Sequence, residues 1–280
     1  MALVIAAGRP VMLVDTSYYI FHRYFATGRW FGFQAVYDPN TPWMEQPEFL
    51  DAFFRHLEND MRRWRKQFGL GPTADIVFCL DCPRSEIFRN GIAEGYKEGR
   101  TAPAGFDGEI FSKALAYLEA RAGVRMMGHA GCEADDIAAI VHGRIREVAG
   151  AEHPILILTN DNDYLQLGDA HTQIFNMAGK DLKARGLKDP WLDLFAKVLL
   201  GDKSDGIAPI RARLGPKTAQ SMLHRARGAE DPEADLEGQV RAMGKEAWEA
   251  YVRNRALIDF RQIPAGLRGA VCQKMECRMG

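Results

Sequence analysis

"PILILTND", residues 154–161, is the segment that decides the fold. Its consecutive aliphatic residues stand between a proline and a polar turn, a pattern that predicts a short strand buried on both faces. Comparable apolar runs occur at 11–15 ("VMLVD"), 74–81 ("ADIVFCLD"), 124–127 ("VRMM") and 172–176 ("TQIFN"). Between these runs, apolar residues recur at helical spacing over 46–67, 107–121 and 133–149. The alternation predicts βαβ units, and hence an α/β fold with a mainly parallel central sheet flanked by helices.

The pattern changes after about residue 190, where we expect no further strands. "WLDLFAKVLLGD", "GPKTAQSMLHRA" and "KEAWEAYVRNRALIDF" all have helical spacing. We therefore predict an α/β domain over 1–190 and a helical region over 191–280. Residues 84–106 are basic, aromatic and punctuated by glycine, with little apolar periodicity. This composition predicts a long loop or a mobile pair of short helices that becomes ordered on a partner.

The bulk composition excludes several classes of protein. The 280 residues are 47% hydrophobic, enough for a large core, and Lys+Arg (36) nearly balance Asp+Glu (37). No apolar run approaches the ~18 residues of a membrane span, and no basic residues precede the apolar start as in a signal peptide. The five cysteines, few and odd in number, favour a reducing cytoplasm. "CLDC" (79–82) has zinc or redox spacing, but its apolar setting favours two buried thiols.

Acidic residues recur where the predicted strands end. Asp15, Asp81 and Asp161 each end a strand, and Asp163 follows two residues later. Because ligands of open parallel sheets bind at the carboxyl ends of the strands, we expect these side chains to converge. "GCEADDIAA" (131–139) and "LLGDKSDG" (199–206) supply the remaining acids of the set, which are Glu133, Asp135, Asp136, Asp202 and Asp205.

Each acid by itself has a structural explanation. Acids in the first turn of a helix gain about 0.3–1 kcal/mol each from the helix dipole, and others cap turns. Nine acids at one edge of a sheet are different, because close carboxylates repel unless cations lie between them. No matching cluster of lysines and arginines alternates with them in sequence, so we predict divalent ions, Mg²⁺ or Mn²⁺. Two such ions are the usual means of cleaving a phosphodiester, one activating water and the other stabilising the leaving oxygen.

The near-zero net charge of the chain includes a basic excess outside the nine acids. The chain has a net charge of −1, and setting the nine acids aside leaves +8 on the other residues. This excess is available for phosphate groups. The basic residues that we single out are Arg84, Arg89, Lys97, Arg100, Arg211, Arg213, Lys217 and Arg225.

Five segments, in this order, resemble the 5′ nuclease superfamily of flap endonucleases, bacteriophage 5′–3′ exonucleases and the 5′ nuclease domain of bacterial DNA polymerase I. They are "VMLVDTSYYIFHRYFA", "FCLDCPRSEIFRNGIAEGYKEGR", "GCEADDIAA", "LTNDNDYLQL" and "LLGDKSDGIAPIRARLGPKTA". They run from about residue 11 to 225 and are specific as a set, whereas "EADD" alone is a weak signal. The tail "YVRNRALIDFRQIP" is similar to the stand-alone phage members.

The resemblance implies a PIN-like fold with two metal sites. Asp15, Asp81, Glu133 and Asp135 would surround the first ion, and Asp161, Asp163 and Asp205 the second, with Asp136 and Asp202 nearby. It also implies an arch at about 84–106, whose Arg89, Tyr96, Lys97 and Arg100 would meet the scissile phosphate. A helix–three-turn–helix at about 199–225 would grip duplex backbone and often holds K⁺ in the family.

One departure concerns the hairpin "GIAPIRARLGPKTA", which is a residue longer than the family pattern and carries Arg211 and Arg213. These fixed charges argue against a K⁺ site and favour direct contact with duplex phosphates. Gly215 and Pro216 predict a helix start, with Lys217 and Thr218 in its first turn. Backbone N–H groups at such a start receive phosphate oxygens.

Together these features predict a Mg²⁺-dependent, structure-specific 5′ nuclease. It would act as a monomer by a two-metal mechanism on branched or nicked duplex DNA with a 5′ single strand, or on RNA–DNA hybrids, with replication proteins as partners. Two alternatives remain. A PIN-type ribonuclease is usually shorter and lacks the arch and the hairpin. A DNA-binding scaffold whose catalysis has lapsed would have lost metal-site acids.

Overall fold

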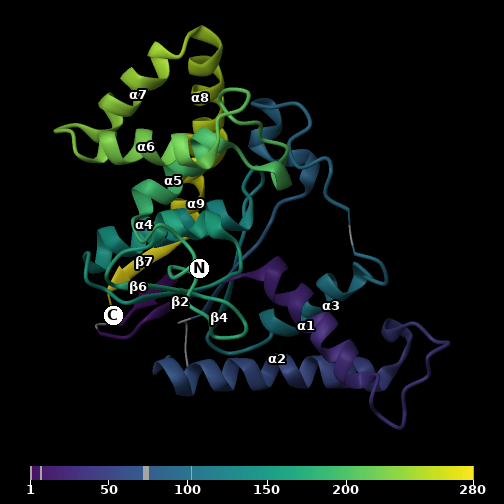
Figure 1. Ribbon diagram of the computed structural model, residues 1–280. Coiled ribbons are helices and arrows are strands. Elements are labelled where there is room, and N and C mark those ends of the chain that lie inside the picture. Colours follow the sequence, from purple (N-terminus) through teal and green to yellow (C-terminus); the bar gives the residue numbers. More distant parts are fainter. Residues whose placement is uncertain (1, 7, 72–75, 102, 280) are drawn as a thin grey trace.

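A parallel five-stranded sheet forms the centre of the protein (Figure 1). The computed structural model describes residues 2–6, 8–71, 76–101 and 103–279. The strands have the order β4-β3-β2-β5-β6, and every pair is parallel, which confirms the predicted fold. They are β2 (Val11–Asp15), β3 (Ile76–Cys79), β4 (Val124–Met127), β5 (Ile155–Leu158) and β6 (Thr172–Phe175). Residues 74 and 75 of one predicted strand lie outside the described residues.

Alternate side chains of the central strands enter two separate cores. Met12 and Val14 of β2 lie in a core that is rich in aromatic residues, with α1 (Thr16–Phe31), α2 (Pro47–Phe68) and α3 (Glu109–Glu119). Leu13 faces the opposite core, with α4 (Ala134–Ala149) and α9 (Ala265–Lys274). Figure 1 shows the two groups of helices on opposite sides of the sheet. Both faces are therefore covered, which explains why the inner strands β2, β3 and β5 consist almost entirely of apolar residues.

The predicted absence of strands after residue 190 is wrong. β7 (Glu276–Met279) pairs in parallel with β1 (Ala2–Ile5) in a second, two-stranded sheet. Its sequence, "ECRM", is short and contains two charged residues, so it has no apolar pattern that predicts a strand. The pairing rests on backbone hydrogen bonds to a segment at the other end of the chain.

The helices that follow residue 190 form their own apolar core. They are α5 (Pro190–Leu200), α6 (Pro216–Arg227), α7 (Pro232–Ala242) and α8 (Lys245–Ile258). Asp189 caps α5 by accepting hydrogen bonds from the backbone N–H groups of Trp191 and Leu192. Between α5 and α6 lies the 3₁₀ helix η5 (Lys203–Asp205), at the place predicted for the helix–three-turn–helix. Among the described residues, no helix is both long and apolar enough to cross a bilayer.

Residues 84–106, here called the arch segment, leave the sheet after β3 and run to the C-terminal helices before returning to α3 (Figure 1). The segment contains two 3₁₀ helices, η2 (Arg84–Glu86) and η3 (Phe88–Gly91), and turns; Ala102 lies outside the described residues. Although the sequence of this segment has little apolar periodicity, Ile87 and Tyr96 pack into the apolar core of α5–α8. The base of the arch segment is therefore fixed to the C-terminal helices.

The cysteines of "CLDC" are free thiols. Cys79 is buried in β3, and Cys82 is half-buried. The side chain of Cys277 lies outside the described residues.

Candidate metal centre

The first acids of the site stand at the ends of neighbouring strands. Asp15, the last residue of β2, caps α1 by accepting a hydrogen bond from Tyr18 N at 3.1 Å. Its other carboxylate oxygen accepts from the hydroxyl of Thr159, which follows β5, at 2.9 Å. Asp81, just after β3, accepts hydrogen bonds from the Ser17 hydroxyl and, at 2.9 Å, from Ala134 N. Asp15 is thus held by the first turn of α1 and by Thr159, and Asp81 is held by the starts of α1 and α4.

The three acids of "GCEADD" have different surroundings at the start of α4. Glu133 is the N-cap residue, and the Asp136 carboxylate accepts a hydrogen bond from its backbone N–H at 3.0 Å. Asp136 is completely buried, so the helix-start explanation applies to this residue. Glu133 and the half-buried Asp135 line the cavity described below.

The remaining acids come from the region beyond β5 and from the end of α5. Asp161 caps the 3₁₀ helix η4 (Asn162–Leu167) by accepting from Asp163 N at 2.9 Å. Asp202 caps η5, and Asp205 ends it. Asp163, Asp202 and Asp205 offer carboxylate oxygens within 4.8 Å of one another, as do Glu133, Asp135 and Asp136.

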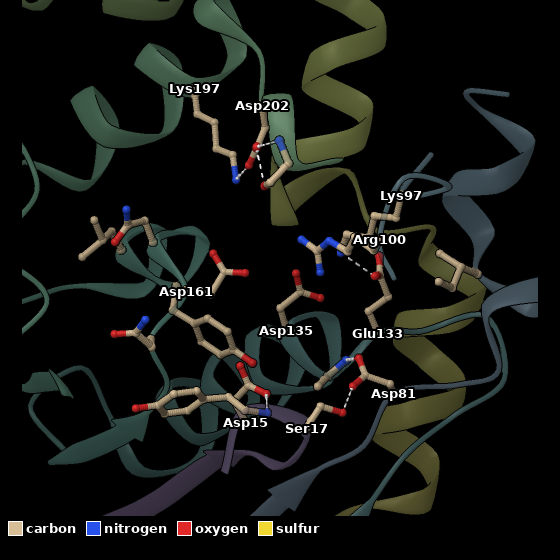
Figure 2. A pocket seen from close by; sticks show the side chains of 18 of the residues that line it. Asp15, Ser17, Asp81, Lys97, Arg100, Glu133, Asp135, Asp161, Lys197 and Asp202 are labelled. Atoms are coloured by element: carbon tan, nitrogen blue, oxygen red, sulfur yellow. Dashed lines mark hydrogen bonds and ion pairs between the residues drawn. The ribbon is translucent and has the colours of Figure 1, made fainter. Parts of the chain in front are cut away.

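A cavity of about 1310 Å³, here called the acidic cavity, joins most of these side chains. Figure 2 shows carboxylates from the sheet, from α4 and from the end of α5 directed into the same space. The acids that line it are Asp15, Asp81, Glu133, Asp135, Asp161 and Asp202. Asp205 instead lines a smaller cavity, of about 320 Å³, beside Tyr96.

The close acids perturb one another's protonation. Burial raises the pKa of Asp15 to about 7, and the nearby Asp81 carboxylate adds to this effect. Burial and the neighbouring Asp161 raise the pKa of Asp163 to about 7, although Lys197 opposes them. Burial and Asp135 also raise the pKa of Glu133. A cation among these oxygens would relieve the repulsion.

Four basic side chains contact these acids, although the sequence shows no matching basic cluster among them, and one of the four is Arg89, which pairs with Glu133 and Asp136. Lys97 Nζ lies 2.6 Å from Glu133 Oε1 and 3.7 Å from an Asp205 oxygen. Arg100 pairs with Asp205. Lys197, which sequence reasoning missed, contacts Asp163 and lies 2.6 Å from an Asp202 oxygen. The sequence feature that could have identified Lys197 is its position as a single lysine in the otherwise apolar "LFAKVLL", five residues before Asp202.

The predicted phosphate-contacting residues of the arch segment divide into two groups. Lys97 and Arg100 line the acidic cavity, as does the exposed Arg84. Arg89 is 2% exposed and pairs with Asp136 and Glu133, and the buried Tyr96 donates to Glu133 at 3.0 Å. The structure therefore does not bring Arg89 and Tyr96 to the cavity.

The predicted duplex-binding residues of the hairpin lie on the surface, in the connection between α5 and α6 and in the first turn of α6. Arg211, Arg213, Lys217 and Thr218 are exposed, and Gly215 is the N-cap of α6, with Pro216 at its first position. Arg213 has φ +62°, a left-handed conformation that is unfavourable for a residue with a side chain. Their contacts with DNA remain a prediction.

The donor set is suited to hard divalent ions. Each acidic group offers carboxylate oxygens, and neither contains a histidine or cysteine. Such oxygens are the ligands that Mg²⁺ and Mn²⁺ prefer. The residues present therefore fit the ions implied by the resemblance.

An α/β sheet with carboxylates gathered beyond its strand ends is the arrangement expected of the 5′ nuclease class. Residues 10–191 match the family model described as "5'-3' exonuclease, N-terminal resolvase-like domain", so the chain belongs to the 5′-3′ exonuclease family of the 5′ nuclease superfamily.

Curated relatives include both long and short proteins. The chain is 29% identical over 221 residues to DNA polymerase I of Pseudomonas aeruginosa, covering 76% of this chain and 22% of that protein. It is 27% identical over 219 residues to Ribonuclease H of Enterobacteria phage T4, covering 71% of this chain and 68% of that protein. The chain thus spans about a fifth of the length of the polymerase.

Solved structures with the same fold include T5 5′-exonuclease with bound zinc, with a TM-score of 0.68 and 16% identity over 95% of this chain and 98% of that chain. A complex of bacteriophage T5 D15 flap endonuclease with DNA and metal ions has a TM-score of 0.65 and 15% identity, covering 95% and 97% of the two chains. At these identities the likeness establishes the fold.

Proposed function

We propose that this protein is a Mg²⁺-dependent, structure-specific 5′ nuclease that hydrolyses phosphodiester bonds near the 5′ ends of DNA. The observation that carries the proposal is the acidic cavity, in which carboxylates from three strand ends and α4 meet Lys97 and Arg100. Membership of the 5′-3′ exonuclease family supports the same reaction class.

Two divalent ions held by the two acidic groups would supply an activated water and charge stabilisation at the leaving oxygen. Glu133 and Asp135 would serve the first ion, with Asp15 and Asp81, and Asp161, Asp163 and Asp205 the second, with Asp202 nearby. Lys97 and Arg100 would hold the phosphate, because they line the same cavity with fixed positive charge. Their present partners, Glu133 and Asp205, would then be released to the ions.

The duplex beyond the cleavage site would lie on the helical region. Exposed Arg211, Arg213 and Lys217, with the N-terminus of α6, present donors to a backbone phosphate. A branched or nicked duplex with a free 5′ strand is the proposed substrate. The phage T4 relative named Ribonuclease H supports including an RNA–DNA hybrid among the substrates. Cleavage of such a hybrid would remove an RNA primer.

The test is cleavage of three 5′-labelled substrates, a flap, a nicked duplex and an RNA–DNA hybrid, in Mg²⁺ and in EDTA. We expect short labelled products from at least the flap in Mg²⁺ and none in EDTA. Single-stranded RNA is the fourth arm, and cleavage of it alone would favour a PIN-type ribonuclease. Duplex binding without any cleavage would favour a lapsed scaffold, although all nine acids are present.

A further inference from the structure

Arg89 occupies a buried position between three parts of the chain. The residue is 2% exposed, and each of its three side-chain nitrogens donates to at least one acceptor. Nη1 and Nη2 each lie 2.7 Å from an oxygen of Asp136, so the two side chains form a bidentate ion pair. Nη1 also lies 3.0 Å from Glu133 Oε2, and Nε donates to the carbonyl of Leu257 at 2.6 Å. One side chain thus joins the arch segment, the start of α4 and the end of α8.

Glu133 receives its hydrogen bonds from the arch segment. Arg89 and the Tyr96 hydroxyl both donate to Oε2 at 3.0 Å, and Lys97 donates to Oε1 at 2.6 Å. Lys97 faces the acidic cavity, but Arg89 and Tyr96 do not line it. The two oxygens of Glu133 are therefore distinguished: Oε2 is held by buried donors, and Oε1 is directed to the cavity side.

We propose that Arg89 is a positioning residue, which fixes the Glu133 carboxylate for a metal ion and couples the arch segment and α8 to the metal centre. The inference rests on the proposed function of the cavity. An arginine is required because its planar fork binds both oxygens of Asp136 while further N–H groups reach Glu133 and Leu257. The ammonium of a lysine is a single point of charge and cannot hold this set of acceptors.

The test is Arg89→Lys, with Arg23→Lys as the matched control. Arg23 forms a bidentate ion pair with the buried Asp60 between α1 and α2, and neither residue lines the acidic cavity. The readouts are thermal unfolding, Mn²⁺ affinity without DNA, and kcat and KM on a flap substrate. Groups that orient metal ligands typically account for about 10- to 100-fold in metal affinity or activity.

We expect Arg89→Lys to weaken Mn²⁺ binding at one site by about tenfold and to lower kcat by a similar factor. Excess Mn²⁺ should restore part of kcat, and KM should stay near the wild-type value. Arg23→Lys should lower the melting temperature without moving Mn²⁺ affinity. If Arg89→Lys does not fold, Tyr96→Phe, which removes the other buried donor to Glu133 Oε2 without changing any charge, should shift Mn²⁺ affinity in the same direction.

Two results would overturn the inference. The first is a lower melting temperature with wild-type Mn²⁺ affinity and kcat, which indicates a purely structural ion pair. The second is a raised KM with unchanged Mn²⁺ affinity, which indicates that Arg89 contacts the substrate. Absence of Mg²⁺-dependent cleavage by the wild-type protein would refute the proposed function instead, while Mn²⁺ binding without DNA would still test Arg89.

Discussion

Lys197 Nζ lies 2.6 Å from a carboxylate oxygen of Asp202, and the same ammonium also contacts Asp163. Although burial opposes it, hydrogen bonding from Lys197 and Ser204 lowers the pKa of Asp202 to about 2. The oxygens that Lys197 contacts belong to one of the two acidic groups suited to a divalent ion. The lysine and an ion therefore compete for the same negative charge.

Lys197→Met should strengthen Mn²⁺ binding in the absence of DNA, because the competing ammonium is removed. A charge at this range in a partly buried site alters binding by roughly tenfold or more. Isothermal titration with Mn²⁺ measures the change. Lys245→Met removes an exposed charge on α8 and should leave the affinity unchanged. Weaker binding by Lys197→Met would show that the lysine supports the ion rather than competing with it.

Asp135→Asn should reduce turnover by several orders of magnitude while leaving the fold intact, because Asp135 faces the acidic cavity. In EDTA the variant should unfold at the same temperature as the wild type or higher, since Asp135 repels Glu133 and Asp136. Single-turnover cleavage and thermal unfolding measure the two effects. Near-normal turnover in Mg²⁺ would contradict the assignment of Asp135 to the metal centre.

Lys97→Ala should damage turnover more than duplex affinity, because Lys97 lies in the acidic cavity beside Glu133. Removing one group that stabilises transition-state charge typically reduces kcat by about 100- to 1000-fold. Turnover at saturating DNA and the Kd for duplex separate the two quantities. Lys113→Ala, which removes the charge of a half-buried lysine on α3 that pairs with Glu109, is the control. Equal losses in turnover and affinity would argue against an active-site role for Lys97.

Stability in EDTA should depend on pH through Asp15. The folded protein keeps a proton on Asp15 up to about pH 7, whereas the unfolded chain releases it near 3.8. The free energy of unfolding should therefore fall as pH rises from about 4 to about 7. Denaturant titrations at several pH values measure this slope, and Asp15→Asn should reduce it. Mg²⁺ should stabilise the wild type more at pH 8 than at pH 5.5, since ions bind the deprotonated acids. A slope unchanged by Asp15→Asn would contradict the raised pKa.

Arg211→Ala or Arg213→Ala should weaken duplex binding about equally on unrelated sequences, because phosphate contacts carry no sequence information. Each lost contact should reduce the salt-dependence slope by roughly one unit. Cleavage of bound substrate should be nearly unchanged. Arg213→Gly is the informative companion, since it removes the charge but relieves the left-handed backbone at φ +62°.

The arginines in the hairpin also predict little dependence on K⁺. Exchanging K⁺ for Na⁺ at constant ionic strength should leave duplex affinity nearly unchanged. A large loss of affinity in Na⁺ would show that the longer hairpin still holds a potassium ion.

The sequence by itself determined the parallel sheet and the position of most acids. A strand buried on both faces must be apolar throughout, so β2, β3 and β5 are visible as apolar runs that end near Asp15, Asp81 and Asp161. Parallel strands bring their carboxyl ends to one edge, which makes convergence of these acids predictable without coordinates. These patterns depend only on residues that are close in the chain, so they can be recognised in the sequence without a structure.

Only the tertiary structure decided which charge faces which. Arg89 and Asp136 are 47 residues apart, and Lys197 and Asp163 are 34 apart, so no spacing rule links either pair. The pairing of β7 with β1 is equally invisible, because backbone hydrogen bonds make it and β7 itself has no apolar pattern. The partner of a charge or of a strand edge is chosen by how distant segments pack, whereas periodicity records only which side of its own helix or strand a residue occupies.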